Sequence, residues 1–64
     1  MHLIFYKTND VFAAEEKLQS AGINTKIVPT PVQDKAYCGV CVYIQEYDME
    51  AVKEVLLQMD YHTV

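Results

Sequence analysis

Two cysteines, three positions apart, carry the chemistry that most narrows what this chain can do. They frame the segment Cys38-Gly39-Val40-Cys41. Where a C-x-x-C segment opens a helix, its two sulfurs can meet in a redox pair. Here the segment opens a run of β-forming residues, and residues three apart in a strand have Cα atoms about 10 Å apart, beyond the roughly 7 Å limit for a disulfide. Two separate thiols are therefore favoured, and a Cys38/Cys41 thiol redox switch would require a turn at Gly39.

Cys38 is the better candidate for a reactive thiol. It would share one face of the strand with Val40, whereas Cys41 would lie on the other face as a small buried side chain. Gly39, at the start of the strand, would let a backbone or a ligand approach closely, or would allow a bulge. Either arrangement would expose the Cys38 sulfur. The competing interpretation is that Cys38 is a packing residue buried in the sheet.

Composition argues against several classes of function. The net charge is −4 and all five basic residues are lysines, which argues against a nucleic-acid partner. No apolar run approaches the roughly 18 residues of a membrane span and no signal-peptide pattern begins the chain, so we expect no membrane partner and a cytoplasmic protein. A zinc site needs about four ligands, and the chain offers two cysteines and two separated histidines. We therefore expect neither a metal nor a cofactor within one chain.

The length of 64 residues allows a single domain, spanning residues 1–64. A domain of this size buries only about 60% of the surface that its unfolded chain exposes, so we expect its stability to be modest or to be helped by self-association. The hydrophobic content of 52% is high for so short a chain and suggests a packed core with one sticky face. A homo-oligomer is consistent with this composition.

Hydrophobic periodicity predicts the element order strand, helix, strand, strand, helix, strand. The first helix is expected to begin after the N-cap Asn9 and to end before Gly22, which suits the left-handed C′ position. The second helix follows Asp48. Strands are expected at residues 3–6, 25–28 and 38–45, with a short one at 61–64. This order predicts an α+β, ferredoxin-like split β-α-β sandwich, with an antiparallel sheet of strand order 4-1-3-2 and two helices on one face.

This topology would place Cys38 beside the end of the first strand and the N-terminus of the first helix. Free amide groups and the positive helix end favour a thiolate there. Asn9 would lie at this helix end, and Lys7 and Lys35 would add positive charge. His62, in the fourth strand, would lie two strand spacings from Cys38, or about 10 Å.

Two prolines stop the second strand and begin the approach to Cys38. Pro29 and Pro31 cannot donate to a sheet ladder, which indicates an edge strand that leaves the sheet. Residues 30–37 then form a polar loop. We expect this loop to be the flexible approach to the Cys38-Gly39 segment.

With these segments, the chain resembles a family of small proteins described as selenium/sulfur carrier-like. The resemblance rests on the N-terminal strand, a helix that ends in Ala21-Gly22-Ile23, the segment Val28-Pro29-Thr30-Pro31 and, after a short polar loop, Cys38-Gly39-Val40. The spacing from the Pro-Thr-Pro segment to the Cys-Gly pair is its most specific part. The resemblance covers most of the chain.

The resemblance implies that Cys38 holds a persulfide or perselenide, receives it from a donor protein and passes it to an acceptor protein. Such a chain would be a carrier or accessory protein and not a stand-alone enzyme with its own turnover. Two alternatives stay open. One is a non-catalytic module that dimerises or binds a small ligand, with Cys38 buried, and the other is the Cys38/Cys41 redox switch.

Overall fold

The computed structural model describes all 64 residues and contains four strands and two helices. In chain order the elements are β1 (His2–Ile4), α1 (Thr8–Ser20), β2 (Lys26–Pro29), β3 (Val40–Tyr43), the short 3-10 helix η1 (Glu46–Asp48), α2 (Met49–Val55) and β4 (His62–Thr63). The element types follow the order that the periodicity predicted, and the domain is α+β.

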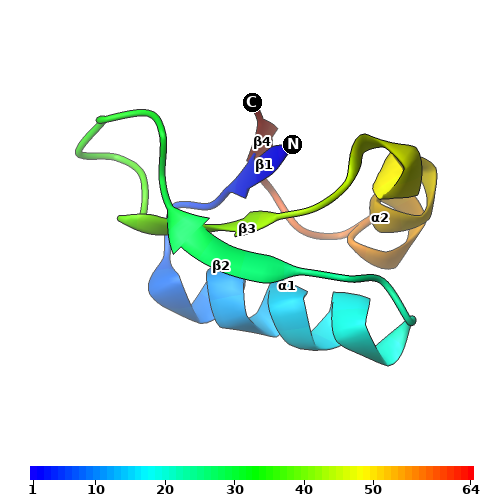
Figure 1. Ribbon diagram of the computed structural model, residues 1–64. Coiled ribbons are helices and arrows are strands. Elements are labelled where there is room, and N and C mark those ends of the chain that lie inside the picture. Colours follow the sequence, from blue (N-terminus) through cyan, green and yellow to red (C-terminus); the bar gives the residue numbers. More distant parts are fainter.

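The four strands form one antiparallel sheet in the order β2-β3-β1-β4, which is 4-1-3-2 when counted from the β4 edge. The first and last strands lie side by side, so the two ends of the chain meet, as Figure 1 shows. The amide of His2 donates to the Val64 carbonyl and the amide of Val64 donates to the His2 carbonyl, at 2.8 and 3.0 Å. The loop between β2 and β3 arches away from the sheet (Figure 1).

Both helices contribute to a single hydrophobic core on one face of the sheet. Alternation along β1 and the residues after it turns Leu3 and Phe5 toward the helices and Ile4 toward the opposite face. All three side chains are fully buried. The core cluster combines strand residues with residues of both helices, namely Leu3, Phe5, Val11, Ala14, Leu18, Ile23, Val42, Ile44, Val52 and Leu56.

The first helix begins two residues earlier than an N-cap at Asn9 predicted. The amide of Val11 donates to the Lys7 carbonyl at 3.2 Å, and the residue that accepts this first intrahelical bond occupies the N-cap position. Lys7 is therefore the N-cap, with an extended backbone and no side-chain capping bond. Asn9 lies inside the helix, so the N-cap prediction was wrong.

The end of α1 shows why a glycine stands at position 22. Gly22 has a φ of +79°. Its amide donates to the Gln19 carbonyl at 3.0 Å, and the amide of Ile23 donates to the Leu18 carbonyl at 2.9 Å. This pair of bonds is the Schellman motif, and the burial of Ile23 completes it with an apolar contact.

Gly39 lies where strand pairing becomes asymmetric. On the β2 side the ladder continues regularly, because Thr30 donates its amide to the Gly39 carbonyl at 3.0 Å. On the β1 side the regular register would place Val40 opposite Phe5, yet the Cys38 amide donates to the Phe5 carbonyl at 2.8 Å. The pairing with β1 therefore departs from the ladder here, as it does at a bulge. A Cβ added at Gly39 would meet no atom within 4 Å, so the packing around this position does not require a glycine.

The two glycines should respond oppositely to alanine. Gly22→Ala should lower the free energy of unfolding by about 1–2 kcal/mol, because an L-residue is strained at positive φ. Gly39→Ala should leave stability unchanged or raise it by about 0.4–1 kcal/mol, because the added methyl group has open space and the unfolded chain loses freedom. Urea unfolding of both variants measures this difference. A larger loss for Gly39→Ala than for Gly22→Ala would contradict the assignment.

Candidate functional site

Hydrogen bonds from two neighbouring segments hold the backbone of Cys38. Its amide donates to the Phe5 carbonyl, just beyond β1, at 2.8 Å. Its carbonyl accepts a hydrogen bond from the Thr30 hydroxyl, just beyond β2, at 2.6 Å. The sequence had suggested that Cys38 begins the third strand. In the structure Cys38 lies two residues before β3. The residue is fixed by neighbours on both sides while its side chain stays half-buried.

The sulfur of Cys38 lies against the first residue of α1. Its Sγ atom is 3.3 Å from the hydroxyl oxygen of Thr8, in a hydrogen bond in which either atom can donate while the thiol is protonated. If Cys38 becomes a thiolate, the Thr8 hydroxyl must be the donor. The expected position beside the N-terminus of α1 is therefore observed. A hydroxyl donor and the positive end of a helix both favour negative charge on this sulfur.

Cys41 occupies a different environment from Cys38. Its side chain is fully buried, and its thiol lies 3.8 Å from the Pro29 carbonyl, to which it donates. Burial raises the pKa of the Cys41 thiol above its ordinary value of 9.0, and a nearby charge on Cys38 would raise this pKa further, whereas a hydrogen bond with Thr30 opposes the increase. Both cysteines are free thiols. Cys41 is a buried packing residue, and Cys38 is the accessible sulfur.

Most of the other residues singled out from the sequence are exposed. Pro29 ends β2, and Pro31 lies on the exposed bend that follows it. Gly39 adjoins Cys38 and is exposed. The Lys7 and Lys35 side chains are exposed, and neither forms a hydrogen bond with Cys38. Asn9 is likewise exposed on the first turn of α1.

His62 belongs to an aromatic cluster with Tyr6 and Tyr37. Its Nε2 atom lies 2.6 Å from the Tyr6 hydroxyl oxygen. The ring centroids of Tyr6 and Tyr37 are 5.4 Å apart, and that of His62 is 5.7 Å from Tyr6 and 5.5 Å from Tyr37. His62 therefore reaches the site through Tyr37, the neighbour of Cys38 in the chain.

Sequence reasoning missed four residues that contact Cys38 or its neighbour. Thr8 was not singled out, although its place after β1 already put it beside the expected position of Cys38. Thr30 was treated as part of a proline-rich stop. The contact between Tyr6 and Tyr37 was not predicted, because it depends on how the loop returns and no sequence pattern encodes it.

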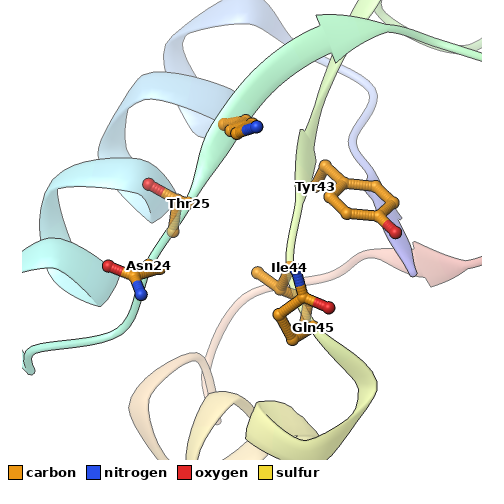
Figure 2. Close-up of a pocket in the computed structure, with 6 residues that line it drawn as sticks. Asn24, Thr25, Tyr43, Ile44 and Gln45 are labelled. Carbon is orange, nitrogen blue, oxygen red and sulfur yellow. The ribbon is translucent and has the colours of Figure 1, made fainter.

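A hollow of about 310 Å³ lies at the far end of β3 from Cys38. Figure 2 shows it between the start of β2 and the end of β3, lined by Asn24, Thr25, Lys26, Tyr43, Ile44 and Gln45. At about 3.3 Å per residue, Tyr43 lies roughly 16 Å along the chain from Cys38. This hollow is therefore separate from the thiol site.

No helix has both the length and the apolar character needed to cross a bilayer. No three side chains among His, Cys, Asp and Glu come together in an arrangement that could hold a metal ion. What the chain does present is a half-buried thiol at the end of an antiparallel sheet, bonded to the first residue of a helix.

A small α+β domain with one accessible thiol at a sheet end is the class that the fold and the site define. The chain belongs to the family described as "Putative Se/S carrier protein-like", whose model matches residues 2–63. No curated protein and no solved structure matches the chain. The matched range includes every helix and strand, and Cys38 and Cys41 both lie within it.

The hydrogen bond from Thr8 should raise the reactivity of Cys38. Thr8→Val removes the hydroxyl at nearly constant volume, and we expect alkylation of Cys38 by iodoacetamide at neutral pH to slow by about two- to tenfold, the range of a net hydrogen bond. Thr8→Ser keeps a hydroxyl and should react at close to the wild-type rate. Mass spectrometry of the Cys38 peptide measures both rates. Equal rates for the valine and serine variants would contradict a role for the hydroxyl.

Burial of Cys41 should make stability fall at alkaline pH. Above pH 9.0 the Cys41 thiol of the unfolded chain loses its proton, whereas the raised pKa keeps this thiol protonated in the folded chain. The unfolded chain then binds fewer protons, so the free energy of unfolding decreases as pH rises beyond 9.0 and is unaffected by Cys41 below it.

Urea unfolding of the wild-type protein and of Cys41→Ala, at pH 7 and at stepwise higher pH, measures this decrease. All other titratable groups are common to both proteins, so their contributions cancel in the difference. The wild type should lose more stability than Cys41→Ala above pH 9.0. Parallel pH profiles for the two proteins would show that Cys41 is not shielded from water.

Proposed function

We propose that the chain is a ferredoxin-like carrier domain that holds one sulfur or selenium atom on Cys38 and passes it between two partner proteins. The observation that carries this proposal is the half-buried Cys38 sulfur, 3.3 Å from the Thr8 hydroxyl, in a chain of the Se/S carrier-like family. Cys38 receives and releases the cargo, and Thr8 stabilises the thiolate that does both.

Loading is an exchange between sulfur atoms. The Cys38 thiolate attacks the outer sulfur of a persulfide on a donor protein. A bond forms between Cys38 Sγ and that outer sulfur, the sulfur–sulfur bond in the donor breaks, and its electron pair leaves with the donor thiolate. The proton of the outer sulfur passes to that thiolate or to water. No net oxidation occurs, and a donor perselenide would react in the same way to leave selenium on Cys38.

Delivery repeats the same exchange with an acceptor thiolate, which attacks the outer atom and restores Cys38 as a thiolate. The chain returns to its starting state only when two partners act in turn, which fits a carrier better than a stand-alone enzyme. Two free thiols are suited to a reducing compartment, and we place the protein in the cytoplasm.

The structure weakens the two alternative functions. The module with a buried Cys38 required the sulfur to be inaccessible, whereas Cys38 is half-buried. The redox switch required the two sulfurs to meet, whereas Cys38 bonds to Thr8 and Cys41 bonds to Pro29. An edge-to-edge dimer would have to pair through β2, where Lys26 is exposed and Pro29 lacks an amide hydrogen, or through β4, which has two residues.

Loading of Cys38 can be tested directly by mass. After incubation with a protein persulfide donor, the wild-type chain should gain the mass of one sulfur atom on the peptide that carries Cys38. A thiol reductant should remove this gain, because the outer sulfur then leaves as sulfide. Intact-protein and peptide mass spectrometry measure both steps.

Matched substitutions identify the sulfur involved. Cys41→Ala should still load, because that thiol is buried, whereas Cys38→Ala should not. Circular dichroism checks that both variants are folded. A folded wild type that stays unmodified by a donor able to load another thiol protein would overturn the proposal, as would loading that survives in Cys38→Ala.

A further inference from the structure

The aromatic cluster of Tyr6, Tyr37 and His62 joins three distant parts of the chain. Tyr6 follows β1, Tyr37 ends the loop between β2 and β3, and His62 begins β4. Every pair of rings is in contact, with Tyr37 tilted 32° to Tyr6 and 66° to His62. These orientations are the offset and edge-on arrangements that aromatic rings prefer.

The cluster flanks the main-chain bond that holds Cys38. That bond runs from the Cys38 amide to the Phe5 carbonyl. Tyr37 precedes the donor residue and Tyr6 follows the acceptor residue, so contact between these two rings joins the same two backbone segments a second time. A backbone motion that carries Tyr37 away from Tyr6 therefore also pulls on the bond between Cys38 and Phe5.

The loop that leads to Cys38 has few other restraints. Its residues from Pro31 to Ala36 are all exposed. Inside it, the Asp34 side chain accepts from the Ala36 amide at 2.9 Å and the Asp34 carbonyl accepts from the Tyr37 amide at 3.0 Å. These bonds shape the tip of the loop and do not attach it to the sheet. Tyr37 is therefore the side chain that anchors the end of the loop next to the thiol.

The hydrogen bond between Tyr6 and His62 fixes the surface on which Tyr37 rests. Tyr6 is 46% exposed and His62 is also exposed, so neither ring is held by burial alone. Their bond of 2.6 Å holds the two rings at 83° to each other. Tyr37 contacts both rings and is only half-exposed.

We infer that Tyr6, Tyr37 and His62 form an aromatic clamp that positions Cys38, with the Tyr6–His62 hydrogen bond as its latch. The clamp keeps the Cys38 sulfur beside Thr8, where the hydroxyl can stabilise the thiolate. The three residues do not touch the cargo, and they act on it through the loop. The role in sulfur transfer rests on the proposed function, whereas the clamp itself does not.

A simpler role for the three rings is to cover Ile4, which is fully buried on the sheet face opposite the helices and pairs with His62. Tyr6→Phe separates the two roles, because it keeps the covering ring and removes only the latch. Tyr43→Phe is the matched control. It makes the same change on the same sheet face, at the end of β3 away from Cys38. There the ring centroids of Tyr43 and His2 are 5.0 Å apart.

Hydrogen exchange of backbone amides tests the clamp. In Tyr6→Phe, the amides of Tyr37 and Cys38 should exchange about two- to tenfold faster, the range of one net hydrogen bond, while the amides between β2 and β3 exchange as in the wild type. Tyr43→Phe should match the wild type throughout. His62→Gln, which keeps a group able to bond Tyr6, should exchange more slowly at these sites than His62→Leu. Equal exchange in Tyr6→Phe and Tyr43→Phe would overturn the clamp.

Sulfur loading provides the second measurement. Under the donor conditions that load the wild type, Tyr6→Phe should acquire sulfur about two- to tenfold more slowly than Tyr43→Phe. Faster amide exchange with unchanged loading would overturn the positioning role. If the wild type acquires no sulfur at all, the proposed function fails, and the exchange measurement still decides whether the clamp exists.

Discussion

One off-register hydrogen bond determines where the thiol of this domain lies. The pairing of β1 with β3 would place Val40 opposite Phe5, yet the Phe5 carbonyl accepts from the Cys38 amide. Gly39 and Val40 are thereby left out of the pairing with β1, whereas both continue the pairing with β2. Cys38 packs against the core on the same face as Val42, and its sulfur lies on Thr8. A regular continuation of β3 would not require that contact.

Helices cover one face of the sheet, and aromatic side chains cover part of the other. Two helices seal one face, while Ile4 and Cys41 on the other face are fully buried without a helix above them. The registers place these two residues side by side, between Val28 and His62. Aromatic rings flank them, with Tyr43 and His2 on one side and the aromatic clamp on the other. In a chain of 64 residues, these rings take the place of a third layer.

Much of the fold could be predicted because strong local signals agreed. Leu18 at helical spacing, Gly22 at the helix end and Pro29 at the strand end each specify local geometry, and the strand order followed from the element order. The errors lay at boundaries. Asn9 seemed the natural cap, but the Lys7 carbonyl is the first acceptor of the helix. Capping propensity is a weak signal that the surrounding structure can override at a helix boundary.

The site was predictable in place but not in detail. Antiparallel pairing alone brought Cys38 to the start of α1, since the start of β3 must lie beside the end of β1. Thr8 and Thr30 were missed because their bonds to Cys38 span 30 and 8 positions and depend on the off-register turn. The clamp was missed for the same reason, since it joins residues up to 56 positions apart.

The two cysteines lie three residues apart and yet differ in their exposure to solvent. Cys41 lies in the ladder, where burial raises its pKa and keeps it as an uncharged thiol. Cys38 lies outside the ladder, half-buried and beside a hydroxyl donor. The proposed carrier function requires a thiol that is exposed and yet held in a defined position. Backbone bonds to Phe5 and Thr30 supply the position, and departure from the strand supplies the exposure.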